Sequence, residues 1–132
     1  MAVAVTNSPI VAFNTVTAIT SNLATVDVDA TAEVFTITPT ASDGKLLILF
    51  KNSNLLQTVA ATNDSTFSMA AGDMWQGKAV TGTITVDTDK MIQVETAKVL
   101  QDDGTILLTV TAGTGDKLLT NNALAIVVYE LL

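Results

Sequence analysis

Carboxylates are the main side chains in this sequence that could do chemistry near neutral pH. The chain contains no histidine and no cysteine, and its six basic residues are all lysines. A Ser-His-Asp or Cys-His arrangement, a thiol nucleophile and a thiolate metal site are therefore impossible. A serine–lysine pair remains conceivable from composition alone. We predict that the protein is not an enzyme and has no catalytic residues and no cofactor.

Acidic residues occur in three close pairs, and their spacing allows one further kind of chemistry. The pairs are Asp27 with Asp29, Asp87 with Asp89, and Asp102 with Asp103. A spacing of two on a strand places both carboxylates on one face, where their oxygens could bind a hard cation such as calcium. Aspartate is also common at turns, because it accepts hydrogen bonds from nearby backbone. Since calcium loops need more ligands than one pair supplies, we interpret the pairs as turn residues, predict no metal site and keep calcium as the open alternative.

The charge of the chain argues against several classes of partner. The net charge is −7, and the lysines are scattered singly along the sequence. Without arginine there is no bidentate donor for phosphate or for guanine. We therefore expect no binding to nucleic acid and none to an anionic membrane surface. No segment approaches the roughly 20 apolar residues of a membrane-spanning helix.

The balance of apolar and charged residues points to a covered surface. Hydrophobic residues make up 48% of the chain and charged residues 14%, whereas a soluble domain typically carries about 25% charged residues. This excess favours a permanent interface, most often with further copies of the same chain. The alternative is an apolar sandwich whose exterior is coated with threonine.

Short β-strands separated by turns are the dominant local pattern. The sequence has 22 threonines, and β-branched residues suit a pleated sheet because their restricted χ1 costs little there. We expect strands over residues 13–20, 33–38, 45–50, 55–61, 66–70, 83–86, 91–95, 105–111 and 123–131. Pro39 should end the second of these, because proline cannot donate to a ladder. The continuous apolar run 45–50 is typical of a strand buried on both faces.

Turn signals complete the pattern. The segment 102–104, Asp-Asp-Gly, is the strongest hairpin signal in the chain, so we expect 105–111 to pair back across it. No convincing helix appears, although residues 118–124 could form one helical turn. Strands separated by turns every 8–12 residues are typical of a sandwich or a barrel. We predict an all-β fold: one antiparallel β-sandwich domain over residues 1–132, Greek-key or jelly-roll-like, with a small β-barrel as the alternative.

Two segments are candidates for contact with a partner. The stretch 69–78 contains Met69, Met74 and the only tryptophan, Trp75, beside two glycines. Tryptophan is a frequent anchor of interfaces, and methionine adapts to irregular surfaces; the alternative is that Trp75 fills one end of the sandwich. Residues 1–10, which are apolar and include Pro9 and Ile10, are either an arm laid on a neighbour or the first edge strand.

These segments also carry a resemblance. The runs 72–78, 91–98 and 103–108, followed by the apolar β finish 125–132, resemble small virion proteins of tailed bacteriophages, in particular the head-decoration (cement) proteins that accompany a major capsid protein. The likeness covers roughly residues 33–132. It implies a small β domain that forms a homo-oligomer, often a trimer, and braces major capsid subunits on the outer surface of the head after synthesis in the host cytoplasm. It implies no catalytic residues.

Other functions remain open on the sequence alone. A carbohydrate-binding or adhesin-type β-sandwich module would need a concave face lined by aromatic residues, and aromatic residues make up only 5% of the chain. A tail or fibre subunit shares the composition expected of a decoration protein. The sequence therefore predicts a structural assembly protein and leaves its partner surface undetermined.

Overall fold

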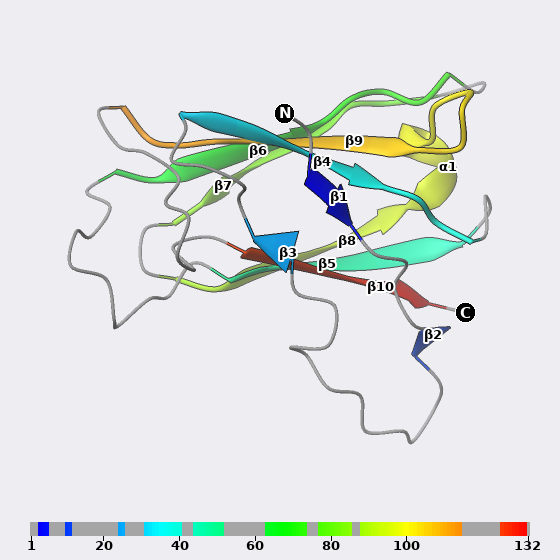
Figure 1. The fold of residues 1–132 in the computed structure, drawn as a ribbon, viewed down its shortest axis with the longest axis horizontal. Helices are drawn as coiled ribbons and strands as arrows, with labels where there is room; N and C mark the ends of the chain where they lie inside the picture. Colours follow the sequence, from blue (N-terminus) through cyan, green and yellow to red (C-terminus); the bar gives the residue numbers. More distant parts are fainter. Residues whose placement is uncertain are drawn as a thin grey trace.

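The computed structural model describes residues 3–5, 10–11, 24–25, 31–40, 44–51, 63–73, 77–85, 88–114 and 125–131, and the fold below is that of these residues (Figure 1). The elements, in chain order, are β1 (Val3–Val5), β2 (Ile10–Val11), β3 (Ala24–Thr25), β4 (Ala32–Ile37), β5 (Lys45–Lys51), β6 (Ser65–Met69), β7 (Val80–Ile84), β8 (Lys90–Glu95), α1 (Thr96–Val99), β9 (Ile106–Thr111) and β10 (Ala125–Leu131).

The strands form two sheets that lie one over the other (Figure 1). Sheet A has the order β1-β4-β9-β6-β7, and sheet B has the order β2-β10-β5-β8, with β3 also paired to β10. All of these pairs are antiparallel except β1 with β4 and β2 with β10. No strand pair joins the two sheets within the described residues. The prediction of an antiparallel β-sandwich is therefore confirmed, and the small closed barrel is wrong.

The order of pairing is nested, as in a jelly roll. Strand β6 pairs with β7, β5 pairs with β8 around them, and β4 pairs with β9 around both. The outer and inner pairs belong to sheet A and the middle pair to sheet B. From β4 to β10, consecutive strands therefore lie in different layers, except at the β6–β7 hairpin. Strand β10 is added to sheet B beside β5.

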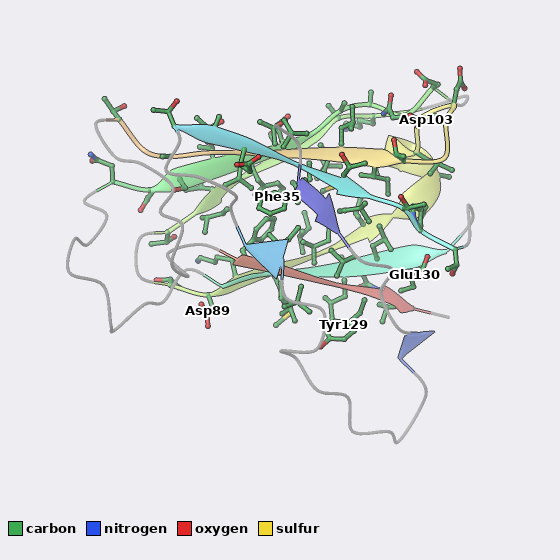
Figure 2. The ribbon with its side chains drawn as sticks, viewed as in Figure 1. Phe35, Asp89, Asp103, Tyr129 and Glu130 are labelled. Atoms are coloured by element: carbon green, nitrogen blue, oxygen red, sulfur yellow. The ribbon has the colours of Figure 1, made fainter. Side chains whose placement is uncertain are left out.

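Alternation along the strands builds the core between the sheets. In β4 the side chains of Phe35 and Ile37 are buried, and Val34 and Thr36 between them are half-buried. The rings of Phe50, from sheet B, and Phe67, from sheet A, stack with their centroids 4.7 Å apart. Figure 2 shows Phe35 between the two layers. Apolar burial of this kind contributes roughly 25 cal/mol for each square ångström removed from water, so the two inner faces hold the layers together.

The apolar run in β5 differs from its prediction. Leu46, Ile48 and Phe50 are buried against sheet A, whereas Leu47 and Leu49 on the outer face are only half-buried. The strand buried on both faces is β10, in which Val127 and Tyr129 are buried on the outer side and Val128 on the inner side. Periodicity alone could not separate these cases, because both strands are continuously apolar.

The Asp-Asp-Gly segment forms a turn, but the predicted hairpin across it is wrong. Gly104 has a φ of +83°, and the amide of Gln101 donates to the carbonyl of Thr105 at 2.8 Å. Strand β9 then enters sheet A between β4 and β6, while the preceding β8 belongs to sheet B. The single helical turn α1 lies between β8 and this turn, at a place where the sequence showed no convincing helix.

Strand β7 begins three residues before its predicted start and includes Gly82, which lies opposite Phe67 and leaves room for its ring. The N-terminal residues form edge strands: β1 lies parallel to β4, and β2 lies parallel to β10. The other residues of the segment 1–10 lie outside the described residues. The predicted strands 13–20 and 55–61 and the helical turn 118–124 lie outside the described residues.

Candidate interaction surfaces

The outer face of sheet A carries a regular array of hydroxyl groups. We call it the hydroxyl face; it consists of Thr66, Ser68, Thr81, Thr83, Thr109 and Thr111. Cross-strand register aligns these residues in two rows of three, Thr83–Thr66–Thr111 and Thr81–Ser68–Thr109. All are exposed except Thr109, which is half-buried. The threonine-coated exterior considered from composition is therefore present on this side of the sandwich.

Part of the outer face of sheet B is apolar. We call this part the apolar face; it consists of Leu47, Leu49, Met91, Val127 and Tyr129, and the exposed Gln93 and Glu95 of β8 lie beside it on the same side. Register aligns Val127, Leu49 and Met91 in one row across β10, β5 and β8. Exposure rises along this row, from 0% at Val127 to 68% at Met91 on the edge strand. Figure 2 shows Tyr129 on the side of sheet B that faces away from sheet A.

Sequence reasoning missed this surface. It assigned the whole of the run 45–50 to a buried strand, so Leu47 and Leu49 were not considered as outer residues. A signal was available in β8, where Met91 alternates with exposed Gln93 and Glu95 and therefore shares their outward face. Sheet A offers a contrast, because Leu107 is its one exposed large hydrophobic residue among those described, at 38%.

One end of the sandwich is closed by hydrogen bonds between the predicted interface stretch 69–78 and residues 98–102. The carbonyl oxygen of Lys98 accepts from the amides of Gly72 at 2.8 Å and Lys78 at 2.9 Å, so one carbonyl joins both stems of the β6–β7 connection. The amide of Asp73 donates to the carbonyl of Leu100 at 3.1 Å. The Asp73 side chain in turn accepts from the amide of Asp102 at 2.8 Å.

Glycine is required at the base of this connection. A Cβ on Gly72 would lie 2.7 Å from the carbonyl oxygen of Leu100, and one on Gly77 would lie 2.0 Å from the carbonyl oxygen of Gly72. Real Cβ atoms do not approach backbone so closely. The two glycines therefore allow the stems to pack against each other and against the residues after α1.

The carboxylates have structural partners. Asp103 accepts from the hydroxyl of Thr105 at 2.6 Å and from its amide at 3.0 Å. The hydrogen bonds from Thr105, first from the hydroxyl and then from the amide, lower the pKa of Asp103 below its ordinary value. The buried Glu130 of β10 accepts from the amide and the hydroxyl of Thr40, which ties the β4–β5 connection to the core. Asp103 and Glu130 therefore both accept hydrogen bonds that fix a turn or a loop.

No group of three or more acidic residues is placed to hold a metal ion in the part of the chain that the structure describes. Asp27, Asp29 and Asp87, from two of the three sequence pairs, lie outside that part. Among the described residues, no helix is long and apolar enough to cross a membrane.

The structure describes two of the five predicted interface residues, Met69 and Ile10. Met69 lies fully buried in the core, on the inner face of β6, and so contributes no surface. Ile10 belongs to β2 and pairs with Glu130. Pro9, Met74 and Trp75 lie outside the described residues. The residues that the structure adds as surface candidates are the members of the apolar face that are exposed or half-buried, namely Met91, Leu47 and Leu49.

Comparisons with known proteins add no relative. No family model matches the chain, and neither the curated proteins nor the solved structures include a significant match.

Proposed function

We propose that this protein is a structural component of a virion, of the head-decoration type, which binds between major capsid subunits on the outer surface of the head. The observation that carries the proposal is the difference between the two outer faces of the sandwich. The hydroxyl face is polar and exposed, whereas the apolar face ends in a methionine that is 68% exposed. A sandwich with one polar face and one apolar face can bury the apolar face against another protein and keep the polar face in water.

In this proposal the two outer faces of the sandwich contact different surroundings. The apolar face turns toward the shell, because covering Leu49 and Met91 removes apolar area from water. The hydroxyl face turns toward solvent, where its threonines are hydrated. The net charge of −7 favours a place on the outer surface of the head, since an acidic protein is repelled by packaged nucleic acid.

The hydrogen-bonded end of the sandwich supports a mechanical role. Backbone hydrogen bonds of 2.8–3.1 Å join Gly72, Asp73 and Lys78 to the carbonyls of Lys98 and Leu100. A brace between capsid subunits must resist deformation, and such bonds hold a connection in one shape. Met74 and Trp75, in the middle of this connection, remain the candidates from sequence for contact with the shell.

The proposal is tested with empty heads assembled from the major capsid protein of the same virion. Purified protein is mixed with heads, and the bound fraction is measured by co-sedimentation. Met91→Lys should abolish binding, because it places a charge in the apolar face. Thr81→Lys, an equivalent charge on the hydroxyl face, is the matched control and should bind like the wild type. Failure of the wild type to sediment with heads would refute the proposal, and so would equal loss of binding in both variants.

A further inference from the structure

The turn between α1 and β9 holds two adjacent groups that can react with each other, the carboxyl group of Asp103 and the amide nitrogen of Gly104. The Gly104 amide donates to the carbonyl of Gln101 at 3.0 Å, the bond that closes a β-turn. The Asp103 side chain is exposed. Beyond its chain neighbours, no atom of the described residues lies within 4 Å of the place that a Cβ on Gly104 would take. The space beside the bond between the two residues is therefore open.

An aspartate that precedes a glycine can rearrange without an enzyme. The Gly104 nitrogen attacks Cγ of the neutral Asp103 carboxyl group, a C–N bond forms, and the carboxyl hydroxyl leaves with the amide proton as water. Water then opens the resulting cyclic imide at either of its carbonyls. Opening at the side-chain carbonyl restores aspartate, whereas opening at the main-chain carbonyl leaves isoaspartate, in which the chain runs through Cβ and Cγ. The two products have the same mass, and water is the only co-reactant.

In the folded turn both reacting groups make other contacts. The Gly104 amide proton is donated to Gln101, so the nitrogen is held away from attack. Oδ1 of Asp103 accepts from the hydroxyl of Thr105 at 2.6 Å and from its amide at 3.0 Å. These bonds lower the pKa of Asp103 and so reduce the fraction of the neutral acid, which is the reactive form. Thr105 therefore acts on both the position and the protonation of the carboxyl group.

A rearrangement at this site would affect more than the turn. Isoaspartate adds one carbon atom to the main chain of residues 101–105, which displaces the groups that form their backbone hydrogen bonds. The same residues hold the β6–β7 connection: the amide of Asp102 donates to Oδ2 of Asp73 at 2.8 Å, and Nε2 of Gln101 donates to the carbonyl of Ala71 at 3.0 Å. Isoaspartate would therefore loosen this end of the sandwich.

We propose that Asp103 is a site of spontaneous isoaspartate formation and that the contacts of Thr105 control its rate. The reaction requires local opening of residues 101–105, which releases Asp103 and Gly104, and does not require the sandwich to unfold. This is a property of the chain itself, and it goes beyond the proposed function without depending on it.

Peptide mapping over a long incubation tests the proposal, because an isoaspartyl peptide separates from its aspartyl isomer at unchanged mass. The incubation is run at mildly acidic pH, in buffer and in enough urea to unfold the chain. In the wild type, isoaspartate at residue 103 should form about tenfold or more faster in urea, since unfolding removes the hydrogen bonds of the turn. Thr105→Val removes the hydroxyl donor, so it should accelerate the reaction about threefold or more in buffer and leave it unchanged in urea.

Two controls separate this effect from a general loosening of the protein. Asp43 is the other aspartate in the chain that precedes a glycine, and its rate should be the same in the wild type and in Thr105→Val. Thr81→Val removes an exposed hydroxyl of the hydroxyl face and should leave the rate at Asp103 unchanged.

Several outcomes would overturn the proposal. One is an equal rate at Asp103 in buffer and in urea, or no isoaspartate there in either. Another is a Thr105→Val protein that reacts at the wild-type rate in buffer. An acceleration that Asp43 shares, or that persists in urea, would also overturn it, because Thr105 would then not act through the turn. None of these results bears on co-sedimentation with heads.

Discussion

Replacement of Gly82 by alanine should destabilise the protein through the aromatic pair that connects the two sheets. A Cβ on Gly82 would lie 2.6 Å from Cε1 and 2.7 Å from Cζ of Phe67. Ordinary contacts between carbon atoms are about 3.5–4.0 Å, so the ring would have to move by about 1 Å. That ring already stacks on Phe50 at 4.7 Å, and the core around it is closely packed.

The size of the effect follows from two opposing contributions. Overpacking a core typically costs about 1–3 kcal/mol. Replacing glycine by alanine within a strand recovers about 0.5–1 kcal/mol of unfolded-state entropy. We therefore expect Gly82→Ala to lower the free energy of unfolding by about 1–2 kcal/mol, and the Tm by about 4–7 °C for a chain of this length.

The assay is a double-mutant cycle with Phe67→Leu, measured by urea and thermal unfolding. Leucine lacks the two ring atoms that the new Cβ would meet, so Gly82→Ala should cost less in that background by about 1 kcal/mol. An equal cost of Gly82→Ala in both backgrounds would show that the Phe67 ring is not the obstacle. A stabilising effect of Gly82→Ala in the wild type would refute the packing argument altogether.

Two further predictions concern hydroxyl groups. The buried hydroxyl of Thr96 has no hydrogen-bond partner in the part of the chain that the structure describes. Thr96→Val should therefore raise the free energy of unfolding by about 1 kcal/mol in urea denaturation, whereas Thr81→Val, at an exposed site, should change it by less than about 0.5 kcal/mol. A less stable Thr96→Val protein would contradict this. The pKa of Asp103 is lowered by Thr105, so the stabilisation it provides is present above its unfolded pKa and is lost as the pH falls through its folded pKa. Thr105→Val should raise the pKa of Asp103 toward its ordinary value in an NMR titration, and an unchanged pKa would exclude the hydroxyl as the main cause.

Local features of the sequence predicted much of the fold. The strands predicted over 33–38, 66–70 and 105–111 agree with β4, β6 and β9 nearly to the residue. Each of these strands has one face buried in the core and one face that is more exposed to solvent. Apolar residues at every second position of the sequence indicate such an arrangement. The two-layer sandwich follows from many such strands in a chain with almost no helical pattern.

The surfaces were much less predictable. Met69 and Trp75 were chosen by residue type, yet Met69 is a core residue, because its place in β6 puts its side chain on the inner face. The apolar face was not predicted, since it is assembled by register from residues of three strands that are distant in sequence. Residue type alone carries no information on such neighbours.

By itself, the sequence determined that the chain is rich in strands, that histidine and cysteine chemistry is impossible, and that turns occur at sites such as Gly104. These properties depend on composition or on a few adjacent residues. Only the tertiary structure decided that β9 leaves its neighbour β8 to pair with β4 and β6, and that Leu49 and Met91 meet on one outer face. Such pairings depend on which distant strands bury the most apolar surface together, and that choice is made by the whole chain at once.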